Sequence, residues 1–162
     1  MNSREVLDTL GRHYPTRSGA WTFVEELAIP CCREVDWMGG GRIDAFAVAC
    51  WASLKYERHA FEVKVSRADL RNELANPYKR SAAVGLSNRF YFVLAAGIDW
   101  LDLPMPEDCG VMVAHSRGIT IARKAPHRDV PPLPAPVVAS LVRRASGWLL
   151  NPVLISRTAS NA

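Results

Sequence analysis

Residues 41–49 read Gly-Arg-Ile-Asp-Ala-Phe-Ala-Val-Ala, and residues 58–65 read Arg-His-Ala-Phe-Glu-Val-Lys-Val. Both stretches are largely apolar, which is typical of strands in a buried sheet. Each nevertheless carries charge in or near its middle: Asp44 in the first, and Glu62 and Lys64 in the second. A buried carboxylate without a partner is costly and is usually neutralised or bound to a cation. The two stretches therefore predict paired strands that hold a cation.

The residue types indicate which chemistry this cation serves. Hydrolysis of a phosphodiester needs a divalent metal that neutralises the phosphate and activates a water, and a further cation beside it helps. Mg²⁺ prefers oxygen ligands and keeps several waters, so two carboxylates and one backbone carbonyl form a sufficient set. We expect Asp44, Glu62 and the carbonyl of Val63 to bind Mg²⁺ or Mn²⁺, and Lys64 to orient or activate the water. The predicted catalytic residues are Asp44, Glu62 and Lys64.

The geometry of the pattern depends on strand register. Side chains alternate across a strand, so Glu62 and Lys64 share one face. If the two stretches form a hairpin that turns near residues 53–57, Asp44 lies opposite the segment Glu62-Val63-Lys64. Asp44 then shares the face of Glu62 and Lys64 when the residue numbers of two directly paired residues, one on each strand, have an even sum. The alternative is an ordinary solvated ion pair between Glu62 and Lys64 on an edge strand.

Ser66 and Asp69 follow the second stretch and predict the start of a helix. Ser-X-X-Asp before an apolar residue is a capping pattern, in which the serine accepts hydrogen bonds from first-turn amides and the acid reaches back to the cap amide. We therefore interpret Asp69 as part of the cap and exclude it from the catalytic set.

These stretches, with Phe-Glu62-Val-Lys64-Val-Ser-Arg-Ala-Asp69-Leu at their centre, resemble the MmcB-like branch of the PD-(D/E)XK nuclease superfamily. The likeness covers roughly residues 21–126. In place of the superfamily's Pro-Asp, this chain has Ile43-Asp44. The resemblance implies an α/β fold with a restriction-endonuclease-like core in the order α-β-β-β-α-β, a central mixed sheet flanked by helices. It also implies DNA hydrolysis in repair, recombination or phage DNA processing.

A third acid could complete the metal shell. Glu26 is our candidate, on a predicted strand face with Thr22, Val24 and Ala28, because related sequences have a glutamate on the strand before the aspartate. Glu25 is then a surface residue. Glu5, on the first predicted helix, is the rival in the superfamily's usual arrangement.

Basic residues that follow the motif are the candidates for nucleic-acid contacts. Cationic side chains bind phosphates, and exposed aromatic rings stack on nucleic-acid bases. The candidates are Arg67, Arg71, Tyr78, Lys79 and Arg80. The expected partner is DNA, with RNA as an open alternative. Nucleases that cut both strands often pair two sites, so a homodimer is among the open oligomeric states.

Hydrophobic periodicity and turn residues predict the remaining elements. We expect helices over residues 3–12, with Ser3 as cap and Gly11 as stop, over 66–86 with an interruption near Asn76-Pro77, and over 137–144. We expect strands over residues 21–29, 43–51, 58–65 and 89–96, and a hairpin of residues 110–115 and 118–123. A helix is the competing prediction for 21–29.

Composition favours a single compact domain. The chain has 162 residues, 49% of them hydrophobic, and a formal net charge of +4, which is compatible with a phosphate-rich partner without demonstrating one. Cys31, Cys32, Cys50 and Cys109 lack zinc-site spacing, and we expect Cys50 to pack in a strand. The sequence shows no signal peptide or long apolar stretch, so we expect a cytoplasmic protein without membrane contact. His59 is expected at the surface of the hairpin.

The end of the chain differs in composition. Residues 1–126 form the predicted nuclease-like domain, and residues 127–162 form a Pro-rich tether with a short helix packed back on it. Two further hypotheses stay open beside a metal-dependent nuclease: a catalytically inactive DNA-binding or recruiting module on the same scaffold, and a structural protein that binds a partner through its Pro-rich tail.

Overall fold

The computed structural model describes residues 1–16, 19–30 and 41–146, which form a mixed α/β fold around one six-stranded sheet. The strands lie in the order β1-β2-β3-β4-β5-β6, and β3, β4 and β5 are mutually parallel while the other neighbours are antiparallel. The strands are β1 (Trp21–Ile29), β2 (Gly41–Ala49), β3 (Arg58–Lys64), β4 (Arg89–Ala95), β5 (Gly110–His115) and β6 (Gly118–Arg123). The helices are α1 (Ser3–His13), α2 (Arg67–Leu74), α3 (Ser81–Leu86) and α4 (Ala135–Ser146), and short 3₁₀ turns span Ala52–Leu54 and Pro77–Arg80.

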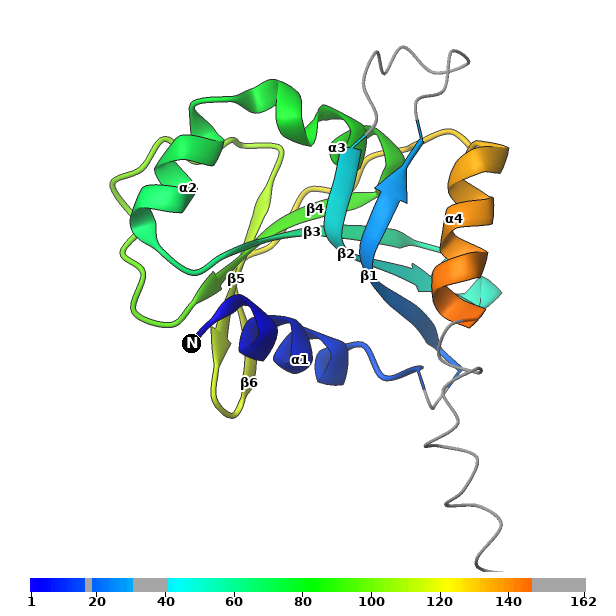
Figure 1. The fold of residues 1–162 in the computed structure, drawn as a ribbon, viewed down its shortest axis with the longest axis horizontal. Coiled ribbons are helices and arrows are strands. Elements are labelled where there is room, and N and C mark those ends of the chain that lie inside the picture. Colours follow the sequence, from blue (N-terminus) through cyan, green and yellow to red (C-terminus); the bar gives the residue numbers. More distant parts are fainter. Residues whose placement is uncertain (17–18, 31–40, 147–162) are drawn as a thin grey trace, which may run out of the picture.

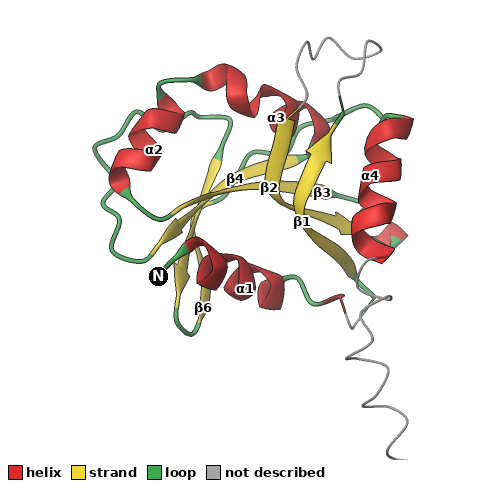
Figure 2. Cartoon of the chain, in the orientation of Figure 1, coloured by secondary structure: helices red, strands yellow, loops and turns green. Residues whose placement is uncertain are grey.

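The sheet is covered on both faces. Helices α2, α3 and α4 contribute side chains to one buried cluster, and α1 contributes to another on the opposite face. The arrangement can be followed in Figures 1 and 2, where α1 lies across the sheet from α2 and α3, and α4 lies beside β1. The parallel pair β3 and β4 is joined through α2 and α3, as a parallel connection requires a crossover.

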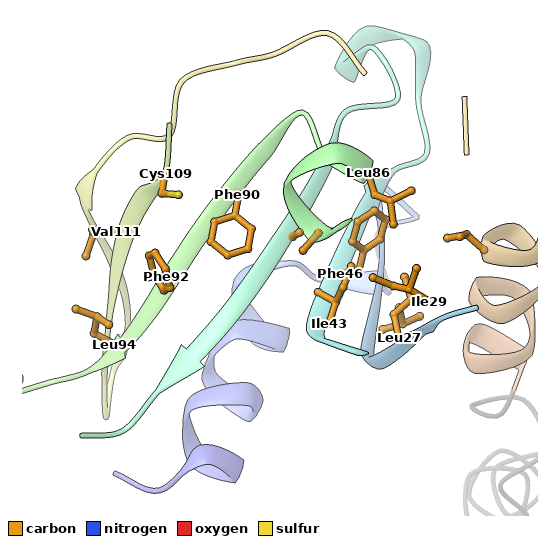
Figure 3. Close-up of a cluster of buried hydrophobic side chains, with 14 of the residues drawn as sticks. Leu27, Ile29, Ile43, Phe46, Leu86, Phe90, Phe92, Leu94, Cys109 and Val111 are labelled. Carbon is orange, nitrogen blue, oxygen red and sulfur yellow. The ribbon is translucent and has the colours of Figure 1, made fainter. Parts of the chain in front are cut away.

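The larger core lies between the sheet and helices α2, α3 and α4. Phe46, Phe90 and Phe92 are completely buried there, and Leu86 of α3 packs with them (Figure 3). Burying a large apolar side chain contributes on the order of 2 kcal/mol. This layer therefore fixes α2 and α3 over β3 and β4.

The cap of the N-terminal helix lies one residue earlier than predicted. The cap is Asn2, not Ser3: its side chain accepts from the Glu5 amide at 2.9 Å, and the Glu5 carboxylate accepts from the Asn2 amide at 2.9 Å. Gly11 does not end the helix, which continues to His13. A Cβ atom at Gly11 would lie 3.4 Å from Cε1 of Phe23, so α1 packs against β1 at this residue.

The other predicted elements are largely confirmed. Strand β1 has its expected bounds, the helical region divides near Asn76-Pro77, and the last two strands match. Strand β2 lies two residues earlier than predicted, so Cys50 follows it and is exposed; the expectation that Cys50 packs within a strand is wrong. Cys31 and Cys32 lie outside the described residues.

His59 is buried, which contradicts its expected surface position. The residue is 8% exposed, its Nδ1 lies 2.9 Å from the Tyr14 hydroxyl, and the rings of Trp21 and Tyr91 pack against it in tilted and edge-to-face arrangements. Strand β3 lies inside the sheet, so both of its faces are covered. Its odd-numbered residues face α1 and the segment that follows α1. Burial lowers the pKa of His59 to about 4, against the opposing effect of Glu57.

This shift predicts a dependence of stability on pH. The unfolded state takes up a proton near the ordinary pKa of 6.5 and the folded state only near 4, so the free energy of unfolding falls as the pH is lowered through this range. In His59→Gln, whose side-chain amide can still form a hydrogen bond to Tyr14, the free energy of unfolding should fall less between pH 7 and pH 4.5 than in the unmodified protein. Urea unfolding at both pH values measures it, and equal losses in the two proteins would contradict the assignment.

Within the described part of the chain, no helix is long and apolar enough to cross a membrane.

Candidate active site at the divergence of β2 and β3

In β1 and β2, the alternation of side chains between the two faces of the sheet changes at the same level. Pairing runs from Glu25 with Ala45 to Leu27 with Ile43 and skips the pair between them, Glu26 and Asp44. Glu26 has φ +51°, the left-handed region that is strained for a residue with a side chain. Val24 and Leu27 consequently belong to the same buried cluster. The regular alternation predicted for the strand is therefore wrong beyond Glu26.

Asp44 lies where β2 separates from β3. The described pairs end at Ala45 with Phe61, and their residue numbers have an even sum, the condition for Asp44 and Glu62 to share a face. Beyond this pair, the Val63 amide donates to Oδ2 of Asp44 at 2.9 Å. A side-chain oxygen thus replaces a strand carbonyl as the acceptor.

Glu62 and Lys64 project from β3 toward α2. Their partners on β4 are Phe92 and Leu94, which belong to the core beneath α2 and α3. The ammonium of Lys64 donates to Oε1 of Glu62 at 2.8 Å, and both side chains are mostly buried, with exposed fractions of 6% and 19%. This burial rules out the alternative of a solvated surface pair.

Glu73 also belongs to the site and was missed by the sequence analysis. It lies on α2 and is 7% exposed, and its Oε2 accepts from Lys64 Nζ at 3.3 Å. Asp69 lies one turn earlier, with Oδ1 3.9 Å from the same ammonium, while Ser66 caps the helix by accepting from the Asp69 amide. The four-residue spacing of Asp69 and Glu73, directly after the strand that carries Lys64, is the signal that could have identified them.

The charges of the site shift its pKa values. Burial raises the pKa of Asp44, although the Val63 hydrogen bond opposes the shift. Burial and the charge of Asp44 raise the pKa of Glu62 to about 7. Burial alone would lower the pKa of Lys64, but its hydrogen bond to Glu62 and the charges of Glu62, Glu73 and Asp69 raise it. Lys64 therefore stays protonated, while the two acids resist ionisation without an added cation.

This donor set fits a hard divalent cation. Among the described residues, Oδ1 of Asp44 and Oε2 of Glu62 accept no hydrogen bond, and the raised pKa values of these acids indicate that nearby positive charge is insufficient. Oxygen donors suit Mg²⁺ or Mn²⁺. No cluster of three or more His, Cys, Asp or Glu side chains arranged to hold a metal occurs in the ranges 1–16, 19–30 and 41–146. The two carboxylates would therefore depend on the Val63 carbonyl and waters for the remaining ligands.

Neither candidate for a third acid, Glu26 or Glu5, lies at the site, and Glu25 beside Glu26 pairs elsewhere as well. Glu26 is half exposed and forms ion pairs with Arg42 at 3.5 Å and Arg144 of α4 at 3.6 Å. Glu25 pairs with Arg4 at 2.6 Å, and Glu5 caps α1. The structure therefore does not gather Glu26 with Asp44 and Glu62.

Two of the proposed nucleic-acid contacts lie on the side of α2 next to the loop that follows β4. Arg67 donates to Asp102 and to the Asp99 carbonyl, both at 2.6 Å, and is thereby held in place. Arg71 is exposed. Both arginines line a cavity of about 510 Å³ together with Leu74, Ala75, Asp102, Leu103 and Pro104.

The other three candidates form the turn between α2 and α3. Tyr78 is 86% exposed and Lys79 is exposed, whereas Arg80 is half-buried. Within the described residues, Lys79 forms no ion pair and the buried Nη1 of Arg80 has no hydrogen-bond partner. Tyr78 and Lys79 are thus the candidates most accessible to a ligand.

Comparison with known proteins gives a fold relationship. No family model and no curated protein match the chain. A solved structure is similar: the SPO1766 protein of unknown function from Silicibacter pomeroyi, with a TM-score of 0.62, 18% sequence identity, and coverage of 100% of this chain and 95% of that one. At this identity the likeness shows a shared fold and no more.

Metal binding can be tested without any activity. We expect millimolar Mg²⁺ or Mn²⁺ to raise the melting temperature of the protein, because a ligand that binds only the folded state stabilises it by about 2.7 kcal/mol at one hundred times its Kd. Asp44→Asn should lose this response. In EDTA at neutral pH it should be at least as stable as the unmodified protein, since its amide oxygen can accept from Val63 and the ionised, buried acid is gone.

The control is Glu107→Gln, which makes the same change of charge at an exposed position. A melting temperature that rises equally in Asp44→Asn and the control would contradict metal binding at Asp44.

Proposed function

We propose that this protein is a divalent-metal-dependent nuclease that hydrolyses phosphodiester bonds of DNA, with a PD-(D/E)XK-like core. The observation that carries the proposal is the placement of Asp44 and Glu62, two buried acids with raised pKa values, beside the protonated Lys64 where β2 and β3 diverge. An ordinary structural ion pair does not need the second acid. A role in repair, recombination or phage DNA processing follows from the resemblance of the motif.

Each residue of the site would have its own role in the reaction. When bound, Mg²⁺ or Mn²⁺ supplies charge neutralisation and an activated water. Asp44 and Glu62 hold the cation, with the Val63 carbonyl beside them. The hydrogen bond from the Val63 amide fixes the Asp44 carboxylate in one orientation. Lys64 orients the attacking water or stabilises the negative charge that develops on the phosphate.

Cleavage of labelled DNA tests this proposal. Single-stranded, duplex and forked substrates are incubated with Mg²⁺, Mn²⁺ or EDTA. We expect metal-dependent cleavage that falls by at least about 100-fold in Asp44→Asn and in Lys64→Gln, as is usual when a group that stabilises transition-state charge is removed. Glu107→Gln should cleave at the unmodified rate.

Equal cleavage by all variants would indicate a contaminating nuclease or another site. DNA binding without cleavage under any condition would favour the inactive recruiting module. If the protein neither binds nor cleaves nucleic acid, including RNA, a structural protein acting through the Pro-rich tail becomes the better hypothesis.

DNA affinity gives a separate prediction for the exposed turn. Lys79→Gln should weaken binding to all sequences and reduce the slope of log K against log salt by about one, since one phosphate contact is lost. Tyr78→Ala should weaken single-stranded binding by about 1 to 3 kcal/mol through lost stacking. Fluorescence anisotropy at several salt concentrations measures both.

Lys124→Gln is the matched control for Lys79, since Lys124 is exposed just beyond β6. If Lys79→Gln and Lys124→Gln change affinity equally, the effect is one of net charge and the turn is not the contact.

A further inference from the structure

Glu73 is the most deeply buried acid of the described residues, with 7% of its surface exposed. Arg58, His59 and Lys64 are the basic side chains buried to a similar depth there. A carboxylate in this position needs a partner of opposite charge with good geometry. Its partner is the ammonium of Lys64, 3.3 Å from Oε2. The pair joins α2 to the end of β3.

Lys64 is held from two directions. Glu62, two residues away on its own strand, accepts from the ammonium at 2.8 Å, and Glu73 accepts from it on the side of α2. A lysine carries three donors on a flexible four-carbon chain, so a single contact leaves its tip poorly fixed. Two carboxylates from separate elements define its position much better.

The two contacts differ in how they would respond to a metal. Glu62 is a proposed metal ligand through its free Oε2, and a cation bound there would draw negative charge away from the carboxylate that Lys64 contacts through Oε1. Glu73 contacts the ammonium from α2, and this contact does not involve the Glu62 carboxylate. Without Glu73, metal binding would therefore weaken the one remaining hydrogen bond of the ammonium.

We infer that Glu73 is a positioning residue that holds the ammonium of Lys64 in the active site while Glu62 binds the metal. The catalytic consequence rests on the proposed nuclease function. The positional part, that Glu73 fixes Lys64, does not depend on it.

The test uses Glu73→Gln, which keeps shape and removes charge, against Glu107→Gln as control. With selective ¹⁵N-lysine labelling the chain gives four ammonium signals, from Lys55, Lys64, Lys79 and Lys124, and Lys64→Gln assigns the one of interest. We expect a Lys64 ammonium signal protected from water exchange in the unmodified protein and in the control. In Glu73→Gln, in the presence of Mg²⁺, exchange of this signal should become at least about tenfold faster.

Cleavage provides the second reading. Misplacement of a reacting group by about 1 Å can lower a rate by about 100-fold. Glu73→Gln should therefore lower kcat by about 10- to 100-fold and leave KM for DNA within about twofold, because Glu73 is buried, lies outside the exposed turn and acts through Lys64. A changed KM with unchanged kcat would overturn the positioning role.

The two proposals fail separately. If the unmodified protein cleaves nothing, the nuclease proposal fails, and the ammonium signal still decides whether Glu73 fixes Lys64. If exchange of the Lys64 signal is the same in Glu73→Gln and the control, the inference is wrong whatever the activity. Should Glu73→Gln not fold, the double variant Lys64→Gln with Glu73→Gln replaces it. Recovery of folding in the double variant supports the contact, and failure to recover overturns it.

Discussion

The hydrogen bond between the Val63 amide and the Asp44 carboxylate determines where the sheet opens. Paired strands normally exchange backbone hydrogen bonds, and here a side chain takes over that role one residue beyond the last described pair. Because the carboxylate lies at the strand edge, β2 departs from β3 without leaving the Val63 amide unpaired. The acid that accepts this hydrogen bond, Asp44, is also one of the two proposed metal ligands.

The helix that follows β3 completes the site because of the connection it serves. The parallel pairing of β3 with β4 requires a crossover, and α2 begins at Arg67, immediately after the strand ends at Lys64. The cap at Ser66 starts the helix at once, so its second turn places Glu73 over the ammonium of Lys64. Apolar packing of Leu70 into the core beneath holds the helix there. The position of Glu73 thus follows from the topology of the sheet.

Local sequence signals predicted what depends on local interactions. The strand bounds, the interrupted helical region and the placement of Asp44 opposite the acid-X-Lys segment follow from periodicity and parity, which a buried sheet strongly enforces. The errors arose where tertiary contacts decide. His59 was predicted at the surface of the hairpin because the sequence does not show that Tyr14 and Trp21 pack against it. Glu26 was predicted to join Asp44 at the metal site. Its left-handed backbone changes the alternation of side chains along β1, and its carboxylate pairs with Arg42 and Arg144 instead.

The strain at Glu26 and the unfavourable burial of Asp44 lie at the same level of two neighbouring strands. A residue in the left-handed region costs on the order of 1 kcal/mol, and a buried acid whose pKa is raised destabilises the fold further when it ionises. The change at Glu26 brings Leu27 into the same buried cluster as Val24, whereas the burial of Asp44 brings no such gain in apolar packing. Unfavourable local features of this kind persist when the surrounding structure enforces them, and they concentrate at functional sites. The burial of Asp44 beside Glu62 and Lys64 therefore supports the proposed cation site independently of any sequence motif.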